Sequence, residues 1–121
     1  MYDCNLIMML VAPDEEHFKA NEPYQTIGRN VQMPFVPFVG MIITVGSNTS
    51  DHPDEEEKLS RYLELSRKIP QVIGLLHVRQ VSYNVDSREF GIELVGHTFT
   101  SLEELHMALE LYKYYGFEIC V

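Results

Sequence analysis

The sequence has no tryptophan, only two cysteines and few basic residues. Nine lysines and arginines stand against eighteen aspartates and glutamates, which gives a net charge of −9. Proteins that bind nucleic acid or anionic membrane surfaces do so mainly through clusters of lysine and arginine. Because the sequence contains no basic run, we expect no direct binding to DNA, RNA or membranes. A basic protein surface remains a suitable partner.

The two cysteines, Cys4 and Cys120, lie near opposite ends of the chain. Two cysteines are too few for the disulfide framework of a small secreted protein, and two small buried side chains are the favoured interpretation. The apolar run 5–12 follows Asp3 and has no basic segment before it, so it does not resemble a signal peptide. No run approaches the ~20 apolar residues of a membrane span. We therefore expect a cytoplasmic protein with reduced cysteines.

The length of 121 residues is typical of one domain, and we expect a single domain over residues 1–121. Residues 1–40 contain two expected strands or an arm, and the prolines Pro34 and Pro37 keep their segment extended but outside the centre of a sheet. The remaining expected elements are a strand at 41–45, a helix from about 53 to 69, strands at 72–85 and 90–94, a helix at 101–115 and a strand at 117–121. This βαββαβ order from about residue 41 predicts an α+β, ferredoxin-like fold with two helices on an antiparallel or mixed sheet.

Apolar residues of the long strand 72–85 change phase along the strand. Leu76 and Val78 occupy even positions, whereas Val81 and Tyr83 occupy odd ones. A shift of one residue would move every following side chain to the other face of the sheet. The pattern therefore predicts a β-bulge or a bend near Arg79 and Gln80.

Both helices have clear end signals. The first begins with an acidic patch that suits the positive end of the helix dipole, formed by Asp51, Asp54, Glu55, Glu56 and Glu57. Its expected inward stripe consists of Leu59, Tyr62, Leu63, Ser66 and Ile69. The second helix starts with the capping box Ser101–Glu104 and ends before Gly116, which suits the position after a helix.

Two groups of side chains raise the alternative of an enzyme. The segment 51–55 is rich in carboxylates, which suit Ca²⁺ or Mg²⁺, but its spacing matches no known metal-binding loop. His97 and His106 lie near Glu103 and Glu110, yet most of these residues share the polar face of the second helix. A solvated face and a helix cap explain both groups more simply. We therefore predict no catalytic residues, no bound metal and no cofactor, and we favour a non-catalytic protein.

The second helix carries more apolar surface than contact with one sheet requires. Beside its main stripe, a second stripe is formed by Met107, Leu111 and Tyr114. This stripe either packs on another segment of the chain or forms a protein interface, where Met and Tyr are common. We expect a non-catalytic protein-binding domain that uses these three residues, with a homodimer among the alternatives. The sharper hypothesis is an acidic inhibitor that covers a basic surface of its partner. The alternative functions are a small metal-dependent or His/carboxylate enzyme and a small-ligand-binding subunit of an assembly.

Overall fold

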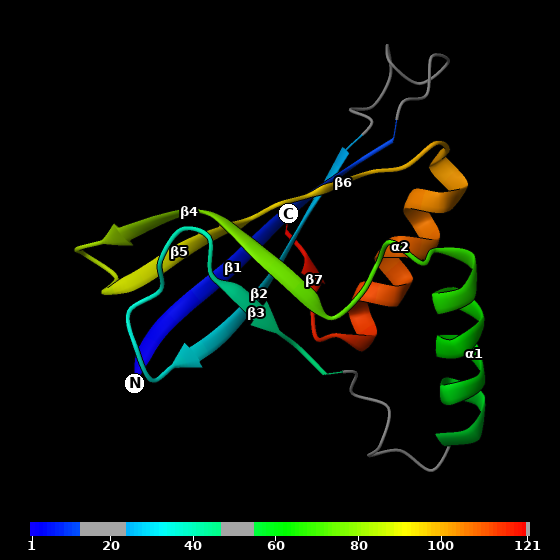
Figure 1. Cartoon of the computed structure of the whole chain (residues 1–121), viewed down its shortest axis with the longest axis horizontal. Coiled ribbons are helices and arrows are strands. Elements are labelled where there is room, and N and C mark those ends of the chain that lie inside the picture. Colours follow the sequence, from blue (N-terminus) through cyan, green and yellow to red (C-terminus); the bar gives the residue numbers. More distant parts are fainter. Residues whose placement is uncertain (13–23, 47–54, 121) are drawn as a thin grey trace.

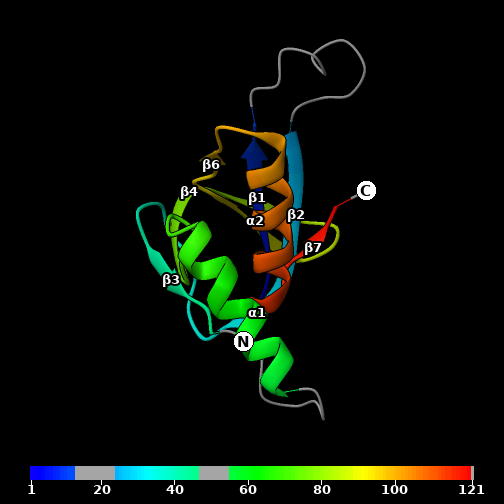
Figure 2. The same ribbon diagram turned by 90° about the vertical axis from the view of Figure 1, so that its right-hand side faces the viewer.

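A computed structural model of the chain describes residues 1–12, 24–46 and 55–120. The described residues form one mixed sheet of seven strands, and both helices lie on the same face of it (Figures 1 and 2). This arrangement confirms the α+β class. In chain order the elements are β1 (Tyr2–Val11), β2 (Tyr24–Met33), β3 (Ile42–Thr44), α1 (Glu55–Lys68), β4 (Leu75–Asn84), β5 (Glu89–Leu94), β6 (His97–Thr98), α2 (Leu102–Tyr114) and β7 (Glu118–Ile119).

The spatial order of the strands differs from the simple ferredoxin-like order that the sequence suggests. The order across the sheet is β3-β4-β5-β1-β2-β7, and β6 also pairs with β1. The two N-terminal strands therefore occupy the interior of the sheet, whereas the expected first core strand, β3, pairs with β4 at an edge. The reason lies in strand length, because β1 and β2 pair over ten residues each while β3 has only three.

Strand β1 is the centre of the sheet and separates its two faces. It runs antiparallel to β2 and parallel to β5. Its even-numbered residues Leu6, Met8 and Leu10 are buried beneath the helices and belong to one hydrophobic core. Its odd-numbered residues Ile7 and Met9 point to the helix-free face. Successive side chains of a strand point to opposite faces of the sheet, so one face of β1 lies on the core and the other faces away from the helices.

The β-bulge predicted in β4 is confirmed. The register between β4 and β5 shifts between Val78 and Gln80, so Arg79 is the extra residue. Because of this shift, Val78 and Val81 lie opposite the buried residues Leu94 and Ile92 in turn. The bulge therefore keeps the apolar side chains on the core face on both sides of the phase change.

The Ser101 cap and the glycine at the end of α2 are as predicted, whereas the Glu104 carboxylate bonds the residue before the cap and not the cap itself. Ser101 Oγ accepts a hydrogen bond from the Glu104 N–H at 3.2 Å, and Gly116 follows the helix with φ of +85°. The Glu104 carboxylate accepts from the N–H and the hydroxyl of Thr100, and these bonds lower the pKa of Glu104. Both ends of α2 are thus fixed by local chemistry.

The inward face of α1 differs in part from the expected stripe. Ile69 is buried and Tyr62 is half-buried, as expected, but Leu59 and Leu63 are 47% and 44% exposed. Leu65 is the further fully buried residue of this helix. The difference arises because α1 packs on α2 as well as toward the sheet, which rotates its buried face away from Leu59 and Leu63.

Candidate functional site

The three predicted interface residues of α2 lie on the side that faces α1. Leu111 is fully buried, whereas Met107 and Tyr114 are half-buried against the core. The Tyr114 ring meets the Tyr62 ring of α1 edge-on, with centroids 5.8 Å apart. Of the two alternatives for the second stripe of α2, Leu111 follows packing within the chain. Contact of Met107 or Tyr114 with another protein stays a prediction.

Polar side chains close the seam between the two helices. The Arg61 guanidinium donates through Nε and Nη2 to the two carboxylate oxygens of Glu110, at 2.8 Å each. These bonds lower the pKa of Glu110. Farther along the seam the Tyr62 and Tyr115 hydroxyls lie 2.8 Å apart. Hydrogen bonds as well as apolar contacts therefore join α1 to α2, which supports an intrachain role for this side of α2.

The acidic patch is described only in part. Asp51 and Asp54 lie outside the described residues, and Glu55 and Glu56 form the first positions of α1. The Glu57 side chain is exposed. The patch as a binding surface therefore stays a prediction, with one of its five side chains shown at the surface.

The two histidines have different surroundings. His97 is half-buried, and its ring is stacked on the Tyr112 ring with centroids 6.3 Å apart and tilted against the Phe99 ring with centroids 6.2 Å apart. Burial lowers the pKa of His97. His106 is exposed on α2. Within residues 1–12, 24–46 and 55–120, no three His, Cys, Asp or Glu side chains gather in a way that could hold a metal ion.

A surface that the sequence reasoning missed lies on the arm, defined here as residues 34–40. Four apolar side chains of this arm are 49% exposed or more: Phe35 (49%), Val36 (50%), Phe38 (59%) and Val39 (65%). The N-terminal end of β1, the arm and the turn between β4 and β5 all lie at the end of the molecule away from the helices (Figure 1). Pro34 and Pro37 were the sequence signal for this surface, because prolines exclude the apolar segment from the interior of a sheet.

The arm is held in place at its centre and at its C-terminal end. Pro37 is buried, and the Met41 N–H donates to the Phe38 carbonyl at 3.2 Å. The Gly40 N–H donates to the Val78 carbonyl at 3.0 Å, and the Val78 N–H donates to the Met41 carbonyl at 2.9 Å. The exposed phenylalanines and valines are therefore presented on an anchored backbone.

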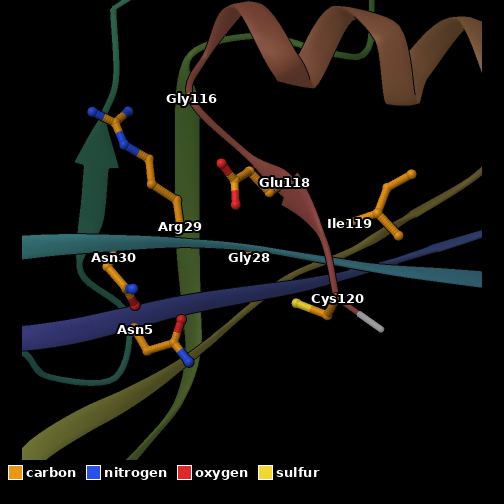
Figure 3. Close-up of a pocket in the computed structure, with 8 residues that line it drawn as sticks. All are labelled: Asn5, Gly28, Arg29, Asn30, Gly116, Glu118, Ile119 and Cys120. Atoms are coloured by element: carbon orange, nitrogen blue, oxygen red, sulfur yellow. The ribbon is translucent and has the colours of Figure 1, made fainter.

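A hollow of about 440 Å³, called the notch below, opens where β7 meets β2 (Figure 3). Arg29 projects on one side of β2 and donates from Nη1 to the Tyr115 carbonyl at 2.7 Å. On the other side, the carboxamides of Asn5 and Asn30 face one another. The complete lining is Asn5, Gly28, Arg29, Asn30, Gly116, Glu118, Ile119 and Cys120.

The two cysteines are free, and they lie in unlike environments. Cys4 is buried in β1, as expected for a small apolar side chain, whereas Cys120 is exposed beside the notch. The Cys120 sulfur lies 2.9 Å from the position that a Cβ would take at Gly28. Glycine at this position thus lets β7 approach β2 closely.

No helix among the described residues is long and apolar enough to cross a membrane. Comparison of the chain with protein-family models, with curated proteins and with solved structures gave no match.

Proposed function

We propose that this chain is a non-catalytic protein-binding domain. The observation that carries the proposal is the exposure of four apolar side chains on one short arm, with Phe38 and Val39 at 59% and 65%. Single exposed apolar residues are ordinary, but a contiguous group is typical of interaction sites. Phenylalanine is also enriched at the centre of protein interfaces.

The anchoring of the arm favours binding. Pro34 and Pro37 restrict the backbone, and the hydrogen bonds of Gly40 and Met41 fix its far end. A surface that is ordered before binding loses less conformational entropy when a partner arrives. The arm is thus suited to insert its side chains into an apolar groove of another protein.

The sharper form of the proposal is an acidic inhibitor that covers a basic surface of its partner. Its support is the net charge of −9 and the carboxylates that begin α1, of which Glu57 is exposed. Charge of this kind accelerates encounter with a basic surface, and the arm then supplies the apolar contact. A cytoplasmic location belongs to this proposal, because both cysteines are free thiols.

The experiment is affinity capture from the native host with three forms of the chain. They are the wild type, an arm variant with Phe38→Ser and Val39→Ser, and the matched control Leu63→Ser. Leu63 suits the control because it is 44% exposed on α1, away from the arm. The proposal expects a protein that the wild type and the control retain and the arm variant loses. Equal capture by all three forms, or no specific capture, would contradict it.

A fourth form tests the acidic variant of the proposal. Substitution of Asp51, Asp54 and Glu57 by their amides removes charge while it keeps side-chain size. If the partner is basic, this form binds more slowly and the wild-type association rate falls steeply with salt. If neither the amide substitutions nor added salt changes the association rate, the arm remains the proposed binding surface and the inhibitor hypothesis is contradicted.

A further inference from the structure

Part of the outer edge of β2 has no strand beside it. Strand β7 pairs with Ile27 and Gly28, and the Cys120 N–H donates to the Thr26 carbonyl at 2.9 Å. Beyond this point, no strand among the described residues pairs with β2 on that side. Pro34 follows the last residue of β2. The open stretch is therefore bounded by β7 at one end and by a proline at the other.

The direction of the backbone groups identifies which residues are available. In a strand, the N–H and C=O of one residue point to the same side and those of the next residue point to the other. The Thr26 carbonyl points to β7, and the β1–β2 register runs without a shift. The backbone N–H and C=O groups therefore also point outward at Gly28, Asn30 and Gln32. Since Gly28 already pairs with Glu118, the available backbone groups are those of Asn30 and Gln32.

Apart from the proline that bounds it, this edge lacks the usual features that prevent strand addition. Natural edge strands are commonly protected by lysines, other inward charges, prolines or bulges. Here the side chains of Asn30 and Gln32 are exposed and neutral, and the sequence has no charged residue from Asn30 to Gly46. Two carboxylates lie beside this neutral stretch, because Asp3 accepts a hydrogen bond from Gln32 Nε2 at 3.1 Å and Glu118 pairs with Gly28. In a chain with a net charge of −9, an edge whose own residues are neutral still repels a second copy less than the acidic start of α1 does.

We infer that a second copy of this chain adds to the β2 edge as an antiparallel strand, with Val31 opposite the second copy's Val31. Asn30 then faces the second copy's Gln32, and each of the two donates its N–H to the other's carbonyl. The two-fold symmetry repeats this pair on the other side of Val31. The inference rests on the proposed function only in that both concern protein binding, because the edge and the arm are different residues.

The register follows from what bounds the open stretch. A symmetric pairing centred on Asn30 would place Gln32 opposite Gly28, whose backbone is already bonded to β7. A pairing centred on Gln32 would place Asn30 opposite Pro34, which has no N–H to donate. Only the pairing centred on Val31 uses both available residues.

The notch gives this register a second contact. In the register centred on Val31, the second copy's arm begins opposite Gly28, where β7 blocks further strand pairing. That arm must then leave the sheet beside the notch of about 440 Å³ (Figure 3). Phe35 and Ile119 are 49% and 42% exposed, so an apolar residue is available on each side of this contact. Symmetry supplies the contact twice.

The first test is the mass of the protein in solution at rising concentration. Sedimentation should show twice the monomer mass of 14.0 kDa at micromolar to sub-millimolar concentration. Added salt should strengthen the dimer, because it screens the repulsion between two acidic chains. Asn30→Pro should weaken association by about tenfold or more, because each copy loses a backbone hydrogen bond. Proline is tolerated there, since the Asn30 N–H points away from β1.

Gln32→Pro serves as a second variant with the same expected loss, in case Asn30→Pro fails to fold. A wild type that remains monomeric over the whole concentration range would overturn the inference. A dimer that withstands both proline variants would overturn it as well. The wild type could instead be a monomer that binds another protein through this edge, and the proline variants could lose that protein. This result would show that the edge binds an extended peptide and not a second copy. Each of these results leaves the test of the arm unaffected.

The register is tested by disulfide trapping in a Cys4→Ala, Cys120→Ser background, because Cys4 is the partner of Val31 in the β1–β2 ladder and would compete for the new thiol. Val31 would lie opposite itself in a non-hydrogen-bonded pair, where Cα atoms are about 4.5 Å apart and a disulfide can form. Val31→Cys should therefore oxidise to a covalent dimer. The matched control is Gln32→Cys, whose two copies are offset by about 7 Å along the strands in addition to the strand spacing. Equal trapping by both variants, or none by Val31→Cys, would contradict the register.

Discussion

The guanidinium of Arg29 in β2 donates to the carbonyl oxygen of Tyr115, at the end of α2, over 2.7 Å. A cation at a helix C-terminus meets both an unpaired carbonyl and the negative end of the helix dipole. The Nε and Cζ atoms of the same guanidinium lie 3.1 and 3.2 Å from the position of a Cβ at Gly116. This contact fixes where the chain leaves α2, and hence where β7 meets β2.

Replacement of Arg29 by methionine should lower the free energy of unfolding by about 1–3 kcal/mol, the usual loss for a hydrogen bond to a charged group. Methionine keeps much of the side-chain length but removes every donor. The measurement is a urea melt. Arg67→Met, at an exposed position of α1, is the control and should change stability by no more than about 0.5 kcal/mol. Equal midpoints for the two variants would show that the contact does not hold β2 to α2.

Leu111→Lys should destabilise the fold by several kcal/mol, because it buries an unpaired charge at a fully buried position. The control is His106→Lys on the same helix, where the side chain is exposed and the cost should be small. Urea melts of both variants check the prediction. If Leu111→Lys left stability intact and abolished association, the second stripe of α2 would be an interface after all.

Gly96→Ala should weaken the pairing of β6 with β1. A Cβ at this position would collide with the Met9 backbone carbonyl, which cannot move without disturbing β1. Forced overpacking of this kind typically costs about 1–3 kcal/mol. Gly46→Ala is the matched control, because a Cβ there meets nothing within 4 Å. Thermal melts that coincide for the two variants would contradict the packing of β6 on β1.

His97 should make the protein less stable in mild acid. Burial lowers its pKa in the folded state, so the unfolded chain takes up a proton more readily. The stability that comes from keeping His97 neutral is fully present above the ordinary histidine pKa of about 6.5. It is lost as pH falls through the pKa of His97 in the folded state. His97→Gln should therefore flatten the dependence of stability on pH in this window. The measurement is urea unfolding at a series of pH values.

Local features of the fold were predictable from the sequence. The bulge at Arg79 and the cap of α2 both follow from patterns within a few residues. Each depends on side-chain alternation or on the hydrogen-bonding capacity of a nearby side chain, such as Ser101. Such signals do not require knowledge of what lies across the sheet.

The spatial arrangement was not predictable in the same way. The central position of β1 depends on pairing with β5, which lies far along the chain. The burial of Leu111 depends on α1, and a helical pattern alone does not identify the segment that covers a stripe. The open edge at Asn30 and Gln32 exists only because β7 is two residues long. All three depend on segments that lie far apart in the chain, which the periodicity of one segment does not reveal.

The most direct test of the proposed protein-binding function is photo-crosslinking from the arm in the native host. A photoreactive benzoyl-phenylalanine in place of Phe38 should form a covalent adduct with a protein, and the adduct mass will show whether that protein is a second copy or another chain. The same amino acid in place of Leu63, which is comparably exposed on α1, should give little adduct. The absence of any protein adduct from position 38, or equal adducts from both positions, would contradict the assignment of the arm as a binding surface.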